Sequence, residues 1–450
     1  MINLPLEYKE RMKSLLGDEY PLYENSLEQP PQKAFRINTK KIAVEDFLNC
    51  CDLAKEKIPY VENGFYLDSQ KIGNHPLHHA GAIYVQEPAA MAPAECAPIE
   101  KGWKVLDMCA APGGKSSQLK AKIGEDGVLV SNEIIPSRCK ILTGNMERLG
   151  FKNVVTTCMD TEKLATVFPA TFDMVMVDAP CSGEGMFRKE EKAVTEWSAE
   201  NVKMCAARQI NILENAAKTL KNGGYIVYAT CTFSLEENEM VIDEFLQNHP
   251  EFEILPVKNE IINSTRDGIR FDGCKCENIN YARRFYPHVS RGEGQFMALL
   301  HNKNEGENYD FNTRKNEKID SCVFDFLDNV LESYDKSQVT MYNGNPIYFT
   351  PDFEVKKGVA FSCGVNIGEV RKNYIQPHHQ FFMAMGDKFK RKIELPLDSE
   401  DLRKYLHGEE INTDCENGWA VVTVCGCTVG GVKVVSGRAK NHYPKGLRSL

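Results

Sequence analysis

Long apolar runs are absent from this chain of 450 residues, and their absence excludes whole classes of protein. A membrane-spanning helix needs about 18 consecutive apolar residues, and no segment approaches that length. The N-terminal stretch MINLPLEYKERMKSLLGDEY carries charges where a secretion signal needs an apolar centre. We therefore expect a cytoplasmic protein without a membrane partner.

A surplus of positive charge is also lacking, because the chain has 54 Lys and Arg residues and 63 Asp and Glu residues, which gives a net charge of −9. This balance argues against indiscriminate binding to polyanions, but it is compatible with a local basic surface. The composition, with 42% hydrophobic and 26% charged residues, is typical of a globular protein. At roughly 100–200 residues per domain, the length predicts two to four domains.

The spacing of paired zinc ligands is missing from the 16 cysteines. The CKC and CGC segments separate their cysteines by a single residue, whereas the cysteines of a zinc pair have about two to four residues between them. The histidines of the segment HPLHHA have no set of cysteines or carboxylates nearby. We expect reduced thiols and no metal site.

Short apolar runs alternate with segments of helical period from Trp103 to about His301. This alternation is typical of a parallel α/β sheet with crossover helices. We expect strands at 103–109, 127–133, 153–160, 172–180 and 223–232, and a last, antiparallel strand at 292–301. After the fifth strand, Ser234 and Glu237 have the spacing of a capping box, which predicts the start of a helix.

The pattern divides the chain into four parts. Residues 1–98 resemble a small α+β module with a lead-in, and residues 99–302 contain the alternating α/β pattern. Residues 303–318 are polar and aperiodic, which is typical of a linker. Residues 319–450 contain short strand-like runs, and we expect a β-rich region there.

The stretch MCAAPGGKSS follows the first expected strand and resembles a phosphate loop at first sight. Cys109 stands where that loop needs its first glycine, and no Gly-x-Gly-x-x-Gly occurs here. Gly113 and Gly114 still allow a close approach of the backbone to a ligand. Glu133 ends the second strand nineteen residues after Gly114, where a carboxylate can accept hydrogen bonds from both hydroxyls of a ribose.

These features favour S-adenosylmethionine, which has a ribose and an adenine but no phosphate. Asp160, at the end of the third strand, is placed to contact an adenine amino group, and Lys115 to contact the amino-acid end of the cofactor. A purely structural turn with surface acids is the alternative to a cofactor site.

Two cysteines follow neighbouring strands of the expected sheet. Cys181 comes after the fourth strand and Cys231 after the fifth, so both thiols should open onto one cleft beside Asp178. Carbon 5 of cytosine is too electron-poor to accept a methyl group, whereas addition of a thiolate to carbon 6 makes it nucleophilic. Asp178 can share a proton with ring nitrogen 3. The spacing does not say which cysteine attacks, and a single buried cysteine is more often structural.

The motifs DMCAAPGGKSSQL, DAPCSGEG and ATCTFSLEENE, with RINTKK and YVQEPAAM upstream, resemble those of the Fmu/Sun family of RNA cytosine-5 methyltransferases. The tail VSGRAKNHYPKGLR resembles the bacterial RsmF-type branch. The resemblance covers nearly the whole chain and implies a Rossmann-like class I methyltransferase fold, with a C-terminal RNA-binding region similar to a PUA domain. It also implies a substrate in small-subunit ribosomal RNA, either naked or in the small ribosomal subunit.

The resemblance further implies roles for single residues. Cys231 would be the nucleophile on carbon 6, and Cys181 would assist release of the methylated product. Contacts to S-adenosylmethionine would come from Cys109, Ala110, Ala111, Pro112, Gly113, Gly114, Lys115, Glu133, Arg138, Asp160 and Asp178. Glu133 stands where many relatives have aspartate, and the longer acid should still reach the ribose.

Basic residues near the C-terminus are candidates for RNA contact. Tyr443 lies in a segment without acidic residues, together with Lys433, Arg438, Lys440, Lys445 and Arg448. Cations beside an aromatic ring suit phosphate contacts and base stacking. A second run, formed by Lys388, Lys390, Arg391 and Lys392, is equally compatible with a solvated face.

Other functions are compatible with parts of this pattern. The alternatives are a non-catalytic ribosome-assembly protein that binds RNA, and a cytosine-5 methyltransferase that acts on tRNA. A DNA cytosine-5 methyltransferase would use Cys181, the cysteine after proline, as its nucleophile. We expect a monomer.

Overall fold

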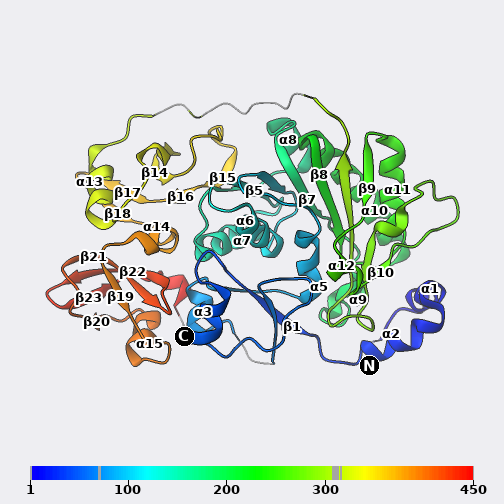
Figure 1. Ribbon diagram of the computed structural model, residues 1–450, viewed down its shortest axis with the longest axis horizontal. Helices are drawn as coiled ribbons and strands as arrows, with labels where there is room; N and C mark the ends of the chain where they lie inside the picture. Colours follow the sequence, from blue (N-terminus) through cyan, green and yellow to red (C-terminus); the bar gives the residue numbers. More distant parts are fainter. Residues whose placement is uncertain (1–2, 69–71, 307–313, 315–316, 449–450) are drawn as a thin grey trace.

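The computed structural model describes residues 3–68, 72–306, 314 and 317–448. A central sheet with helices on both sides forms the middle of the molecule (Figure 1). The N-terminal residues lie below this sheet, and the C-terminal residues lie beside it in Figure 1. The architecture is therefore the expected Rossmann-like α/β sheet with an additional module at each end of the chain.

The central sheet has the strand order β10-β11-β12-β8-β7-β4-β5-β6-β15, and β9 pairs with β12. Strands β4 to β8 are parallel, and β12 runs antiparallel to β8. The five parallel strands and the antiparallel strand fall within the ranges expected from the sequence, except that β8 starts three residues earlier and β12 ends one residue later. Their bounds are β4 Lys104–Asp107, β5 Val128–Asn132, β6 Val154–Thr157, β7 Phe172–Asp178, β8 Leu220–Thr230 and β12 Gln295–Asn302. The strands β9 Phe252–Leu255, β10 Arg266–Asp267, β11 Arg283–Phe285 and β15 Ala360–Cys363 complete the sheet.

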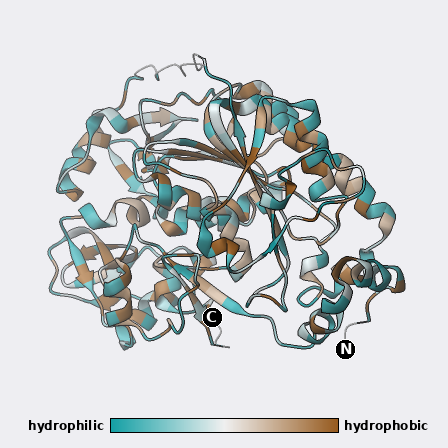
Figure 2. Ribbon diagram, turned by 45° about the vertical axis from the view of Figure 1, so that its right-hand side comes forward, coloured by the Kyte–Doolittle hydropathy of each residue, from teal (hydrophilic) through white to brown (hydrophobic). Residues whose placement is uncertain are grey.

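Helices cover both faces of this sheet, which explains why its strands are continuous apolar runs. Along β7, Val175 and Val177 face one core cluster, while Met174 and Met176 face the other. The first cluster is closed by α8 Thr161–Val167, α10 Ala199–Thr219 and α11 Glu239–Asn248. The second is closed by α6 Gly114–Ile123 and α7 Pro136–Leu149. Figure 2 shows the central strands mostly in the hydrophobic colour and the surrounding helices in both colours.

The predicted capping box after β8 is wrong. Helix α11 begins at Glu239 and has Asn238 as its N-cap residue, so Ser234 and Glu237 precede the helix. The carboxylate of Glu237 accepts hydrogen bonds from Ser182 and Gln209, which lie far away in the sequence. Long-range polar partners therefore override the local capping signal.

The N-terminal residues form two separate parts. The helices α1 Leu6–Leu16 and α2 Tyr20–Ser26 pack against the segments that follow β7 and β8, where Tyr8 and Tyr23 contact Phe187 and Phe233. A three-stranded sheet, β2-β1-β3, follows. Its strands are β1 Lys33–Ile37, β2 Gly64–Leu67 and β3 Ile83–Val85, with the helices α3 Val44–Cys50, α4 Pro76–His79 and α5 Pro88–Met91. The buried Arg36 joins this sheet to α6 by donating to Gly114 O and Ser117 Oγ, at 2.7 Å each.

The C-terminal residues complete the central sheet and then form a sheet of their own. Strand β15 pairs antiparallel with β6 at the edge of the central sheet. The second sheet has the order β19-β21-β22-β23-β20, and its core is continuous with that of the N-terminal module. Its elements are β19 Lys392–Glu394, α15 Glu400–His407, β20 Ile411–Asn412, β21 Gly418–Val424, β22 Cys427–Val435 and β23 Arg438–Asn441.

Smaller elements connect these two sheets. They are α13 Ser321–Val330, β13 Val339–Tyr342, β14 Asn345–Tyr348, β16 Val365–Asn366, β17 Gly368–Arg371, β18 Tyr374–Pro377 and α14 His379–Met385. Of the linker expected at 303–318, residues 307–313 and 315–316 lie outside the described residues. Among the residues that the structure describes, no helix is both long and apolar enough to cross a bilayer.

Candidate active site

The candidate residues gather at the carboxyl ends of the parallel strands. The chain proceeds from β4 to β5 and β6 on one side, whereas β7 and β8 lie on the other side of β4. The strand order thus reverses between β4 and β7, which is where open α/β sheets bind their ligands. Strands β4, β5, β7 and β8 are each followed by residues that the sequence singled out.

The glycine loop connects β4 to α6. Its backbone is tied to the neighbouring strands, because Met108 N donates to Met176 O at 2.9 Å and Ala110 N donates to Asn132 O at 2.8 Å. Gly113, at φ +110°, is the N-cap residue of α6, and a Cβ there would lie 2.9 Å from a methyl carbon of Met146. Only glycine fits both the backbone conformation and the space.

Glu133 is buried directly after β5. Its carboxylate accepts from Ile135 N at 2.9 Å and lies 3.2 Å from Arg138 Nη1. Arg138 also donates to Ala111 O at 3.1 Å. Arg138 therefore links the predicted ribose acid to the glycine loop.

Asp160 lies after β6 and caps α8, where its Oδ1 accepts from Lys163 N at 2.8 Å. Asp107, the last residue of β4, is fully buried and accepts from Ser116 Oγ at 2.6 Å. Burial raises the pKa of Asp107 to about 7. Asp107 was not among the predicted site residues, although it lies at a strand end as Glu133 does.

Lys115 and Asp178 form an ion pair across the point where the strand order reverses. The distance between Lys115 Nζ and Asp178 Oδ2 is 2.7 Å, and the two side chains are 8% and 34% exposed. The pair joins the first turn of α6 to the end of β7. Asp178 is therefore held at the carboxyl end of β7, with one carboxylate oxygen paired with the Lys115 ammonium group.

The two cysteines meet at the same edge of the sheet as this ion pair. Strands β7 and β8 are parallel with Asp178 opposite Ala229, so the segments that follow them run side by side. Cys181 Sγ and Cys231 Sγ are 3.2 Å apart, and both residues are half-buried. The hydrogen bond with Cys231 and burial raise the pKa of Cys181. Both effects favour the protonated form of Cys181.

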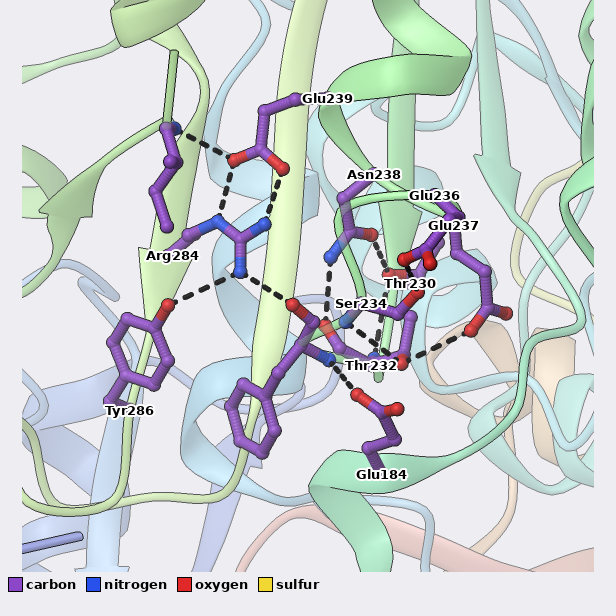
Figure 3. A network of polar contacts seen from close by, with 12 residues as sticks. Glu184, Thr230, Thr232, Ser234, Glu236, Glu237, Asn238, Glu239, Arg284 and Tyr286 are labelled. Atoms are coloured by element: carbon purple, nitrogen blue, oxygen red, sulfur yellow. Dashed lines mark hydrogen bonds and ion pairs between the residues drawn. The ribbon is translucent and has the colours of Figure 1, made fainter. Parts of the chain in front are cut away.

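A buried polar network supports the two cysteine loops, and Figure 3 shows the part of this network around Glu184, Thr232 and Glu237. Glu237 accepts from Ser182 N at 2.9 Å and from Gln209 Nε2 at 3.0 Å, and burial raises its pKa to about 7. Glu184 accepts from Trp197 Nε1 at 2.8 Å and from Phe233 N at 2.9 Å. Local sequence patterns gave no signal for these contacts, because the partners lie 13 to 55 positions apart.

An ion pair between Arg284 and Glu239 lies at the end of this network (Figure 3). Arg284 Nε donates to Glu239 Oε1 at 2.5 Å, and Arg284 Nη1 donates to Phe233 O at 2.8 Å. The two side chains are 2% and 0% exposed. The pair therefore connects β11 to the start of α11. Through Phe233 O, Arg284 also holds the segment that follows Cys231.

Some of the basic residues near the C-terminus line one face of the second sheet. Trp419 on β21 is opposite Lys433 on β22, and Lys433 is opposite Lys440 on β23. Both lysines and Arg438 are exposed. The stacking role suggested for Tyr443 is wrong, because this side chain is buried and its hydroxyl is 2.8 Å from His79 Nδ1.

The second basic run is largely engaged with its neighbours. Lys390 Nζ donates to Asp328 O at 2.6 Å, and Lys392 Nζ donates to Asp387 O at 2.7 Å. Within the described ranges, no group of three or more His, Cys, Asp or Glu side chains is arranged to hold a metal ion.

Three family models match the chain. The model for 16S rRNA methyltransferase RsmB/F matches residues 95–301. The model for the N-terminal domain of 16S rRNA methyltransferase RsmF matches residues 4–88, and that for the methyltransferase RsmF PUA domain matches residues 392–449. The second sheet is therefore a PUA domain.

Named relatives match over nearly the full length. Ribosomal RNA small subunit methyltransferase F from Vibrio vulnificus (strain YJ016) is 31% identical, and the match covers 99% of this chain and 98% of that protein. The protein of the same name from Aeromonas salmonicida (strain A449) is 30% identical, and the match covers 94% and 92%.

Solved structures share the fold. A methyltransferase homolog protein from Pyrococcus horikoshii is 30% identical, with a TM-score of 0.59, and the match covers 67% of this chain and 96% of that chain. The structure of NSun6 from Pyrococcus horikoshii with SFG is 21% identical, with a TM-score of 0.58, and the match covers 68% and 100%.

Proposed function

Because this chain belongs to the ribosomal RNA small subunit methyltransferase F family of S-adenosylmethionine-dependent methyltransferases, we propose that it methylates carbon 5 of a cytidine in small-subunit ribosomal RNA. The reaction proceeds through a covalent bond between Cys231 and the cytosine. One observation carries this proposal: the sulfur atoms of Cys181 and Cys231 are 3.2 Å apart, at the sheet edge that also holds the Lys115–Asp178 ion pair. Two thiols at the same carboxyl-end edge of the sheet as the glycine loop fit this chemistry better than they fit methylation of an amino group, which needs no thiol.

Cys231 begins the reaction. Its thiolate adds to carbon 6 of the cytosine, which leaves an enamine whose carbon 5 is nucleophilic. S-adenosylmethionine, when bound, supplies the electrophilic methyl group. A base then removes the proton from carbon 5, the double bond re-forms, and the sulfur of Cys231 leaves carbon 6.

Cys181 assists this last stage. The hydrogen bond with Cys231 and burial raise the pKa of Cys181, which favours its protonated form as a proton donor. During product release, the Cys181 thiol lies within hydrogen-bonding distance of the departing sulfur. Asp178 shares a proton with ring nitrogen 3 as charge develops there, and Lys115 holds the carboxylate in place.

The residues around the glycine loop fit a cofactor that has a ribose and a positive charge. Glu133 accepts hydrogen bonds from the ribose hydroxyls, and the loop Cys109–Lys115 approaches the amino-acid end with its backbone. Arg138 positions Glu133, and Asp160 contacts the adenine amino group.

RNA is held by surfaces outside the central sheet. We assign RNA contact to residues 1–98 and to the C-terminal region 319–450, and catalysis to residues 99–302. The exposed Lys433, Arg438 and Lys440 contact phosphates. The target cytosine leaves its stack at a cost of a few kcal/mol, which favours a loop or partly assembled RNA. The enzyme then works in the cytoplasm, as a monomer, where ribosomal subunits are assembled.

Methyl transfer from labelled S-adenosylmethionine to ribosomal RNA tests this proposal. With Cys231→Ala we expect neither methylation nor a covalent adduct, and with Cys181→Ala a protein–RNA adduct that persists on a denaturing gel. Cys322→Ala, which changes a half-buried cysteine on α13, is the matched control and should behave like the native protein. An adduct with Cys231→Ala and none with Cys181→Ala would mean that the two roles are reversed.

The same assay separates the alternatives. A ribosome-assembly protein without activity would protect RNA from nucleases without labelling it, and an enzyme specific for tRNA would label tRNA alone. Bisulfite sequencing of the labelled RNA then identifies the modified cytidine.

A further inference from the structure

Glu237 contacts both cysteine loops at once. Its Oε1 accepts from Ser182 N at 2.9 Å, and its Oε2 accepts from Ser182 Oγ at 2.5 Å and from Thr232 Oγ1 at 3.3 Å. Ser182 directly follows Cys181, and Thr232 directly follows Cys231. One carboxylate therefore fixes the residue next to each thiol.

Further contacts fix Glu237 itself. Its side chain is fully buried, and Gln209 Nε2 on α10 donates to Oε1 at 3.0 Å. Its backbone oxygen accepts from Tyr228 Oη at 2.6 Å, on the strand that leads to Cys231. The hydroxyls of Ser182 and Thr232 are also 2.9 Å apart, so the two loops meet at the carboxylate.

We propose that Glu237 is a positioning residue that sets the distance between the two thiols. This inference rests on the proposed function, in which Cys231 and Cys181 act in succession on one cytosine. A carboxylate with two oxygen atoms can accept from both loops at the same time, and the methyl group of an alanine can accept from neither. The link from Glu184 to Phe233 N is independent of Glu237, so the loops keep a second connection when Glu237 is changed.

The equilibrium between the two thiols and oxidised glutathione measures their proximity directly. One glutathione disulfide oxidises the pair to a Cys181–Cys231 disulfide and releases two glutathione thiols, so the equilibrium constant reports the effective concentration of one thiol near the other. Peptide mapping by mass spectrometry identifies the bond among the other cysteines. Neither RNA nor activity is needed.

We expect Glu237→Ala to lower this equilibrium constant by about tenfold or more, because the substitution removes the buried hydrogen bonds to a carboxylate that hold both loops. Glu237→Gln should stay within about threefold, because its amide oxygen accepts from Ser182 N and its NH2 group donates to the hydroxyl oxygens. Glu214→Ala, which removes a carboxylate that pairs with His249, is the control and should leave the constant unchanged.

Kinetics complete the test. Glu237→Ala should lower the single-turnover methylation rate by a factor similar to that of the thiol equilibrium and leave the affinity for S-adenosylmethionine unchanged. Thr232→Val, which removes one hydroxyl from the same contact, should shift the thiol equilibrium in the same direction by a smaller factor. An unchanged equilibrium in Glu237→Ala and Thr232→Val would overturn the inference. If Glu237→Ala lowers the equilibrium constant but the native protein does not methylate RNA, the positioning role is supported and the proposed reaction is refuted.

Discussion

Replacing Arg284 with methionine tests the contribution of the buried ion pair beside the cysteine loops. Methionine keeps much of the volume of the side chain and removes its charge and donors. In the native structure, the Arg284 guanidinium binds both carboxylate oxygens of Glu239 and the backbone oxygen of Phe233. The substitution leaves the carboxylate of Glu239, which is 0% exposed, without its cation.

The loss in the free energy of unfolding depends on the burial of the Glu239 carboxylate. Removing one partner of a buried ion pair costs about 3–5 kcal/mol, because the remaining charge is no longer compensated. Loss of the hydrogen bond to Phe233 O adds about 1 kcal/mol. Replacing both partners with apolar residues, as in Arg284→Met with Glu239→Leu, removes the uncompensated charge and should recover most of the loss.

Urea unfolding followed by circular dichroism measures these differences in the free energy of unfolding. We expect Arg284→Met to lose at least about 3 kcal/mol, and the double variant to lie within about 2 kcal/mol of the native protein. A loss below about 1 kcal/mol for Arg284→Met would refute the reasoning. It would mean that water or a local rearrangement compensates the charge of Glu239.

Two further predictions concern the cofactor loop and the basic face. Because the pKa of Asp107 is raised from 3.8 to about 7, its carboxyl group stabilises the fold below pH 4, and this contribution is lost as the pH rises to 7. The free energy of unfolding of Asp107→Asn relative to the native protein should therefore rise by up to about 4 kcal/mol between pH 4 and pH 8, and a constant difference would contradict the assignment. Lys433→Ala with Lys440→Ala should lower the salt dependence of RNA binding by about 0.7–0.9 in slope for each lysine that neutralises a phosphate, whereas Lys101→Ala, before the amino end of β4, should leave it unchanged.

The strand ends were predictable from the sequence, because an apolar run and the polar residue that follows it are both features of one short segment. Continuous apolar runs identify the buried strands, and the residues that follow them are fixed by chain continuity. Glu133, Asp178 and the two cysteines therefore lie at the same edge of the sheet, as predicted. The ion pair between Lys115 and Asp178 was not predicted, because Lys115 was expected to contact the amino-acid end of the cofactor.

The contacts that orient the site were not predictable in this way. Glu237 had the spacing of a capping residue, but its partner Ser182 lies 55 positions earlier in the chain. Tyr443 lies among basic residues in the sequence, yet its ring is buried against the N-terminal module. Both outcomes depend on which segments meet in space, and no periodicity within a single segment contains that information.

Because β15 pairs with β6, the central sheet is not complete without residues from the C-terminal region. Residues 360–363 supply the last strand of this sheet, almost sixty positions beyond the end of β12. A fragment that stops at residue 302 keeps every residue assigned to the chemistry and the pairing of β6 with β5, but the backbone N–H and C=O groups of β6 that face β15 lose their partners. An open edge of this kind favours intermolecular pairing, so such a fragment should self-associate more strongly than the 450-residue chain that contains β15.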